Sequence, residues 1–212
     1  MFKFSRSTLI ASILASAIAL VGSGCGKPAD GDATQAKVDI AGELDESSYK
    51  QAAAKVLADN RRASADAALT EDRLDAEVGR VEALIALADK LDVDKVRLDD
   101  AELTSTLGML YVRKAAFHVD SAQQAGIYSA KGFRYLDRAV AKYPDNITAR
   151  LNRGFTSAKV PEFMNKSAVA RDDLSFVAQR PEFAALPPDL QAKVGSTLQE
   201  IEQRLAKSAA RP

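Results

Sequence analysis

The sequence YLDRAVAKYPDNITARLNRG, residues 135–154, contains a Pro-Asp-Asn corner between two segments whose apolar residues recur at helical spacing. Pro144 has no backbone N–H to donate, and its ring clashes with the preceding turn, so it cannot continue the first segment as a helix. Asp145 or Asn146 can cap a second helix that begins directly after the corner. This stretch therefore predicts two helices joined by a tight turn, and a fold built from such pairs.

The same steps of three and four recur on both sides of this hairpin, which predicts about seven helices and no convincing strand. Absent tryptophan, 6% aromatic residues and abundant alanine also favour closely packed helices over sheets. The expected fold class is all-α. The predicted helices run from Ser48 to about Ala68, from Thr70 to Leu91, from Asp99 or Asp100 to a stop at Gly126, and over 133–143, 147–158, 168–179 and 190–205.

The composition is that of one ordinary domain with a charged surface. The chain has 212 residues, of which 47% are hydrophobic and 27% charged. Lys plus Arg and Asp plus Glu balance at 29 each, and the sequence contains no basic run. This balance argues against nucleic acid as a partner.

The first 24 residues have the layout of a secretory signal peptide. Lys3 and Arg6 precede an uncharged run over 7–21, and small residues lead to Cys25, the only cysteine. The segment resembles a bacterial lipoprotein signal, in which such a cysteine becomes the lipidated first residue of the mature chain. Ser23 and Gly24 fit that motif, whereas Gly22 stands where Leu or Val is usual.

This resemblance implies an acylated, palmitate-type anchor on Cys25 and a protein held in the bacterial cell envelope. A lone thiol in an exported protein has no partner for an internal disulfide, which lipidation explains. The alternatives are an incidental thiol left by cleavage nearby, or an uncleaved amphipathic anchor. Gly26, in place of Asp, implies by resemblance the outer membrane, facing the periplasm. We expect a signal peptide over 1–24, a polar flexible tether over 25–47 and a helical domain over 48–209.

The region from Leu107 to about Pro181 resembles tetratricopeptide repeats, which are helix-turn-helix units of about 34 residues. Small and bulky residues carry the resemblance, together with prolines at two turns. They are Leu107, Gly108 and Tyr111 in a first helix; Gly132, Leu136, Ala139 and Pro144 in a second; then Gly154, followed by Ala170, Leu174, Val177 and Pro181. The first unit needs about a dozen extra residues between Tyr111 and Gly132 to match the family. The resemblance implies stacked helical hairpins in a short α-solenoid; an irregular helical bundle is the alternative.

In this family the first helix of each unit lines a groove that binds a peptide or a partner helix. The corresponding positions are Ser105, Met109, Val112 and Arg113 in one unit, and Leu151, Phe155, Ala158 and Lys159 in the next. Some members bind a terminal carboxylate with Lys, Asn and Arg, but Ser105, Met109, Leu151 and Phe155 stand at those places. The resemblance therefore implies an apolar peptide or helix as the occupant. The alternative is that these side chains belong to the core.

The sequence contains no recognisable catalytic or metal-binding constellation. His118 is the only histidine, and a structural role is expected for it. We expect no enzyme activity, no metal and no cofactor. The predicted function is a lipid-anchored scaffold or assembly factor that binds another envelope protein. The alternative is a periplasmic accessory that binds a small ligand for a transport system.

Overall fold

The computed structural model describes residues 46–65, 70–91 and 97–209. These residues form seven α-helices, three short 3-10 helices and no strand, which confirms the all-α prediction for this part of the chain. The α-helices are α2 (Glu46–Ala65), α3 (Glu71–Leu91), α4 (Arg97–Ala115), α5 (Ala122–Lys142), α6 (Ile147–Lys159), α7 (Ser167–Ala178) and α8 (Pro188–Ala209). The 3-10 helices are η2 (Ala116–His118), η3 (Glu162–Met164) and η4 (Pro181–Ala185).

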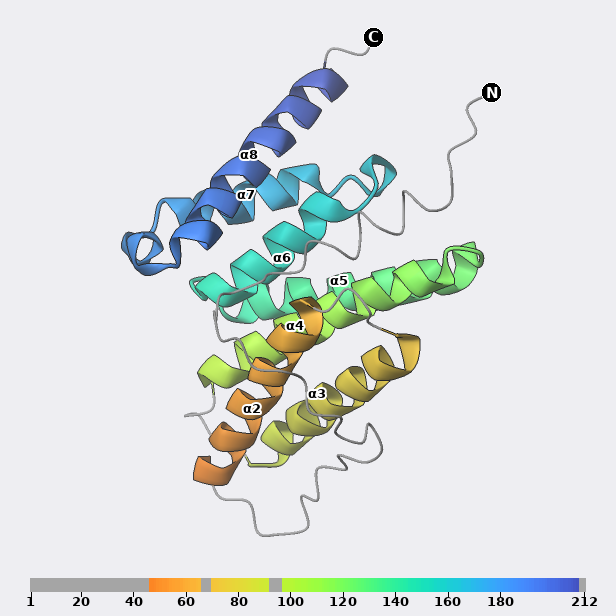
Figure 1. Ribbon diagram of the computed structural model, residues 1–212, viewed down its shortest axis with the longest axis vertical. Coiled ribbons are helices and arrows are strands. Elements are labelled where there is room, and N and C mark those ends of the chain that lie inside the picture. Colours follow the sequence, from red (N-terminus) through yellow and green to blue (C-terminus); the bar gives the residue numbers. More distant parts are fainter. Residues whose placement is uncertain (1–45, 66–69, 92–96, 210–212) are drawn as a thin grey trace, which may run out of the picture.

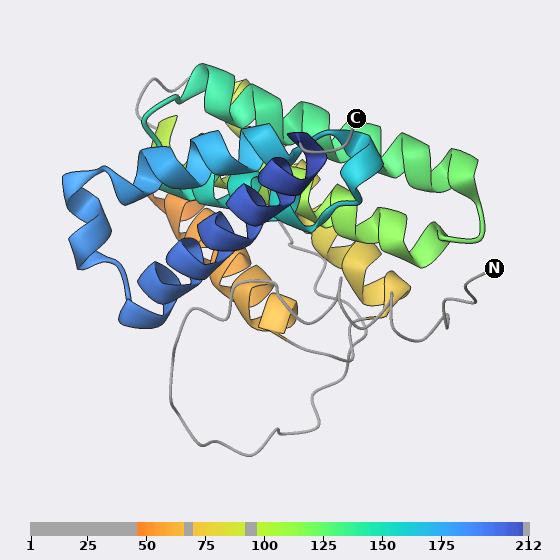
Figure 2. The ribbon, with the colours of Figure 1, turned by 90° about the horizontal axis from the view of Figure 1, so that it is seen from above.

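The helices pack in pairs that follow one another in chain order. Figure 1 shows α2 and α3 towards one end of the long axis, α4 and α5 across the middle, and α7 and α8 towards the other end. The most extensive contacts lie between α4 and α5 and between α6 and α7, and α4 also packs on α6. The last helix, α8, packs on α7 and crosses it at an angle (Figure 2).

The corner at residues 144–146 is built as its sequence predicts. The side chain of Asn146, not that of Asp145, caps α6 by accepting a hydrogen bond from the N–H of Ala149 at 2.8 Å. Nε of Arg150 donates to the carbonyl of Pro144 at 2.9 Å. These two bonds use polar groups that the break between helices would otherwise leave without partners.

The predicted third helix is wrong in both its start and its stop. The α-helix ends at Ala115, and α5 begins at Ala122, so Gly126 lies inside α5. Ser121 caps α5, its hydroxyl accepting a hydrogen bond from the N–H of Gln124 at 3.4 Å. A capping serine outweighed the glycine here, because a helix interior tolerates glycine at a cost of about 1 kcal/mol. Asp100 lies within α4 and accepts hydrogen bonds from the Tyr143 hydroxyl and Lys142 instead of capping the helix.

Glycines set the close approach of α4 and α5. A Cβ on Gly108 would lie 2.7 Å from the carbonyl oxygen of Gly132, and a Cβ on Gly132 would lie 2.6 Å from that of Gly108. Both distances are below any ordinary contact, so the two backbones touch directly. Gly154 serves similarly between α6 and α7, where a Cβ would lie 2.9 Å from the Leu174 side chain.

Two main groups of buried apolar side chains hold the described helices together. One joins α2, α3, α4 and their neighbours, and the other joins α6, α7 and α8. The first contains Tyr49, Leu74, Val81, Leu84, Leu103, Leu107 and Leu110, and the second contains Leu151, Phe155, Leu174, Val177, Leu190, Val194 and Ile201. The helix pairs are therefore packed into one another by their apolar faces.

The predicted signal peptide, Cys25 and residues 26–45 of the predicted tether lie outside the described residues. Glu46 and Ser47, which the tether was expected to include, are the first residues of α2. Among the helices that the structure describes, none combines the length and the hydropathy needed to cross a bilayer.

Candidate functional site

Two side-chain hydrogen bonds fix how α4 and α6 lie against each other. Thr148 Oγ1 donates to Glu102 Oε1 at 3.2 Å, and Asn152 Nδ2 donates to Ser105 Oγ at 3.0 Å. The partners are 46 and 47 residues apart in the chain, so both bonds pair α4 with α6 at nearly the same offset. The two helices therefore run in the same direction and in register.

The register has a consequence at the far ends of these two helices. The offset of 46 residues takes Arg113, in the last turn of α4, to Lys159, in the last turn of α6. The last turn of a helix favours a cation because its carbonyl groups carry partial negative charge. Arg113 and Lys159 are therefore each favoured by the helix that carries them. The parallel register of α4 and α6 places both residues at the C-terminal ends of the two helices.

The eight predicted groove residues divide into two sets by burial. Four are buried among the chain's own side chains and four are half-buried. The buried set is Ser105, Leu151, Phe155 and Ala158, and the half-buried set is Met109, Val112, Arg113 and Lys159. In this conformation only the half-buried set retains surface for a partner. Its members belong to the second half of α4 and the end of α6.

A third helix adds cations to the same region. Lys193, on α8, lies with its Nζ 5.2 Å from the centroid of the Phe155 ring. Nη1 of Arg204, also on α8, donates to the carbonyl of Ala158 at 2.9 Å, a contact that satisfies one of the last carbonyls of α6. We call Arg113, Lys159 and Lys193 the cationic cluster.

Burial disfavours the charged forms of all three residues of the cluster, and repulsion by the other two cations adds to this effect at Lys159. Burial lowers the pKa of Lys159 to about 7, and the charges of Lys193 and Arg113 contribute to the shift. Burial lowers the pKa of Lys193 as well, although Asp189 on the same helix partly opposes the change. The pKa of Arg113 is lowered by burial too. Half-buried positions with shifted pKa values are characteristic of functional sites.

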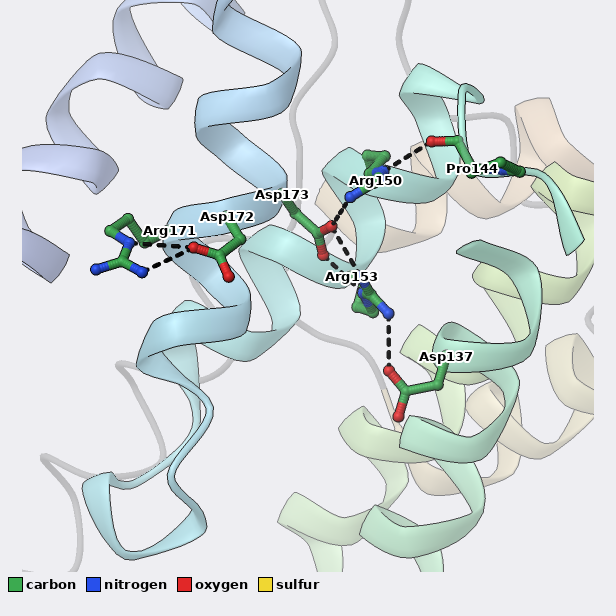
Figure 3. A network of polar contacts seen from close by, with 7 residues as sticks. All are labelled: Asp137, Pro144, Arg150, Arg153, Arg171, Asp172 and Asp173. Carbon is green, nitrogen blue, oxygen red and sulfur yellow. Dashed lines mark hydrogen bonds and ion pairs between the residues drawn. The ribbon is translucent and has the colours of Figure 1, made fainter. Parts of the chain in front are cut away.

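A second polar centre lies between α5, α6 and α7 (Figure 3). Asp173, which is fully buried, accepts hydrogen bonds from Arg150 at 2.9 Å and from Arg153 at 2.7 and 2.9 Å. Arg153 also donates to Asp137 on α5 at 3.0 Å. Burial opposes the charge of Arg153, but its bonds to Asp173 and Asp137 outweigh burial and raise its pKa. Because every charge here has an opposite partner, this centre joins three helices and leaves no charge for a ligand.

The only histidine joins elements of the fold. His118, in η2, places Nε2 2.9 Å from Oε1 of Glu71 on α3, and its ring stacks on that of Tyr128 on α5 at 4.9 Å between centroids. These contacts fit the structural role that the sequence predicts. Within the described ranges, no three His, Cys, Asp or Glu side chains are placed to hold a metal ion.

Sequence reasoning missed Lys193 and Asp173. Both lie in ordinary helical patterns, and nothing nearby in the sequence marks either one. What identifies them is their contact with α6, which depends on how α7 and α8 dock. Spacing alone does not encode that docking.

Comparison with protein-family models, with curated proteins and with solved structures found no match to this chain.

Proposed function

We propose that this chain is a lipid-anchored interaction scaffold of the bacterial cell envelope, in which tetratricopeptide-like helical hairpins bind another envelope protein. The observation that carries the proposal is the in-register packing of α4 on α6, each with its own antiparallel neighbour, α5 or α7. Repeating hairpins of this kind present side chains of their first helices on a shared face.

The shared face is bounded by the half-buried set of residues. Met109 and Val112 are half-buried in the last two turns of α4, where Val112 packs against Gly132 of α5, and Lys159 is half-buried in the last turn of α6. A methionine adapts its shape to different apolar partners, and the adjacent cations add polar contacts. This mixture suits a protein surface, which combines both kinds of contact.

Site-specific photocrosslinking in cells tests the interaction. A photoreactive residue is placed at Met109 or Val112, and the matched control is placed at Lys55, an exposed position on α2. We expect one protein, identified by mass spectrometry, to be captured from the first two positions and not from the third. Capture of the same proteins from all three positions, or of none, would contradict the proposal.

The anchor is tested separately by Cys25→Ser. The expected result is loss of acyl labelling and release of the protein from the membrane fraction, because a stable anchor requires the hydrocarbon chains. Unchanged acyl labelling and fractionation would show that Cys25 is not the anchor, whatever the outcome of crosslinking.

A further inference from the structure

Three large apolar side chains in the described part of the chain remain mostly in water. Val119 is 54% exposed, Ile127 is 57% exposed and Phe163 is 81% exposed. Val119 and Ile127 lie in the turn between α4 and α5 and in the first two turns of α5, and Phe163 lies in η3, between α6 and α7. We call these three residues the exposed apolar set.

The register of the fold brings the set to one end of the domain. α4 and α6 run in the same direction, and the offset of 46 residues takes Val119, just past α4, to Asn165, just past η3. Lys166, the next residue, places Nζ 4.4 Å from the centroid of the Phe133 ring on α5, so the second turn lies against the helix that leaves the first. Figure 1 shows both turns on the same side of the molecule.

Phe163 is exposed although its turn is well defined. The N–H of Met164 donates to the carbonyl of Pro161 at 3.0 Å. The N–H of Asn165 donates to the carbonyl of Glu162 at 2.9 Å, and its φ of 52° is a left-handed conformation that asparagine tolerates. A defined backbone therefore holds the ring in solvent, which reduces the entropy cost of binding through it.

The same tripeptide, Pro-Glu-Phe, occurs a second time with the opposite outcome. It begins η4, and there Phe183 is half-buried and packs against the apolar side chains that join α6, α7 and α8. In the first copy, Phe163 keeps four fifths of its surface in water. The exposure of Phe163 therefore comes from its place in the fold and not from the turn itself.

Few charges surround the exposed apolar set. Residues 116–127 and 160–169 carry it, and among these 22 residues the only Asp, Glu, Lys or Arg are Asp120, Glu162 and Lys166. That is about half the charged fraction of 27% in the whole chain. Two acids and one base give no net attraction for an anion, so this end of the domain suits an apolar contact.

Two observations favour a lipid surface as the occupant. The set protrudes from two separate turns, and a bilayer interface accepts protruding apolar side chains without matching pockets. The proposed anchor provides the second observation, because 20 residues separate Cys25 from Glu46. A polar chain of that length spans on average roughly 25 Å, so the anchor would keep the domain within about one domain diameter of the bilayer.

We propose that the exposed apolar set inserts into the interface of the bilayer that holds the lipid anchor, so that the α4–α5 and α6–α7 turns face the membrane. This contact rests on the proposed anchor and orients the domain. Burial of the apolar side chains drives it, and the anchor raises the effective concentration of lipid. Met109, ten residues before Val119, lies roughly 15 Å back from this end, which leaves the scaffold face outside the bilayer.

The chain contains no tryptophan, so a single introduced tryptophan reports its own surroundings. Phe163→Trp is made in the full chain, which is extracted from membranes and reconstituted into phosphatidylcholine vesicles with or without brominated acyl chains. We expect its emission to shift to the blue and to be quenched by the bromines. The matched control is Asp145→Trp, whose side chain position is 76% exposed at the other end of the 13-residue α6, roughly 20 Å away. The control should be neither shifted nor quenched.

The other two members of the set are tested in the same assay. Adding Val119→Ser and Ile127→Ser to Phe163→Trp should reduce the ratio of inserted to free domain about tenfold, because two apolar side chains are lost. All three side chains are more than half exposed, so the melting temperature should stay the same in every variant. Quenching should also be independent of salt and of added anionic lipid, since the turns carry no net positive charge.

Three results would overturn the proposal. The first is equal quenching at positions 163 and 145, or quenching at neither. The second is a blue shift of Phe163→Trp that grows with protein concentration in the absence of vesicles, which would identify a second copy of the chain as the occupant. The third is quenching that requires anionic lipid and disappears in high salt, which would identify a headgroup contact in place of apolar insertion.

The anchor and the lipid contact fail in different ways. If the acylated chain stays with the vesicles and Phe163→Trp remains unquenched, the anchor stands and the lipid contact falls. If the recovered chain carries no acyl group and Phe163→Trp is still quenched when vesicles are added in excess, the lipid contact stands and the anchor falls.

Discussion

Replacing Gly132 by alanine should destabilise the domain, because α4 and α5 have no room for a methyl group between them. The new Cβ would lie 2.6 Å from the carbonyl oxygen of Gly108 and 2.8 Å from the backbone nitrogen of Val112. Both obstacles are backbone atoms of a helix, so relief requires the two helices to move apart. Overpacking of this kind costs about 1–3 kcal/mol, and the rigidity of both backbones favours the upper part of that range.

Alanine also has a favourable effect that must be subtracted. It is the better helix former by about 1 kcal/mol. The net loss is then about 1–2 kcal/mol of unfolding free energy, which lowers the melting temperature of a domain of this size by roughly 2–8 °C. Urea unfolding followed by circular dichroism at the helical band measures the free energy, and a thermal scan measures the temperature.

Gly79→Ala provides the matched control. Gly79 is also within a helix, but a Cβ there meets no atom within 4 Å, so only the propensity gain of about 1 kcal/mol remains. The two substitutions should therefore change stability in opposite directions. If Gly132→Ala is as stable as Gly79→Ala, the direct contact between the α4 and α5 backbones does not exist in solution.

Other substitutions test the polar contacts. Asp173→Asn should lower the free energy of unfolding in urea by about 3–5 kcal/mol, because it leaves two partly buried arginines without their carboxylate. The control is Asp172→Asn, which should change that free energy by no more than about 0.5 kcal/mol, since the Asp172 side chain is 64% exposed. Equal effects of the two substitutions would contradict the network. Asn146→Ala should cost about 1 kcal/mol through loss of the α6 cap, and no change would show that the cap is dispensable. Lys159 has its pKa lowered in the folded state to about 7 from the ordinary 10.5, so the unfolded chain binds more protons between these pH values and the Lys159 contribution to stability falls as pH falls through 7. Lys159→Met should consequently gain more stability relative to the original chain at pH 6 than at pH 9, and a gain independent of pH would contradict this assignment.

The helical fold was predictable from the sequence because its signals are local. Pro144 breaks one helix and Asn146 caps the next within three residues, and the structure places both as expected. The boundary between α4 and α5 was not found, since Ser121 offers a single capping hydroxyl and no proline accompanies it. Gly126, five residues later, is a competing stop signal that points to a later helix end.

The candidate site was only partly predictable because register is not a local property. The sequence predicts a first repeat unit about a dozen residues longer than the family unit of about 34 residues. The structure agrees in length, because it pairs α4 with α6 at offsets of 46 and 47 residues. That longer unit aligns Arg113 with Lys159, which the sequence named without linking their charges. Lys193 lies on α8. The docking of α8 on α6 and α7 depends on the whole group of buried apolar side chains that joins these three helices.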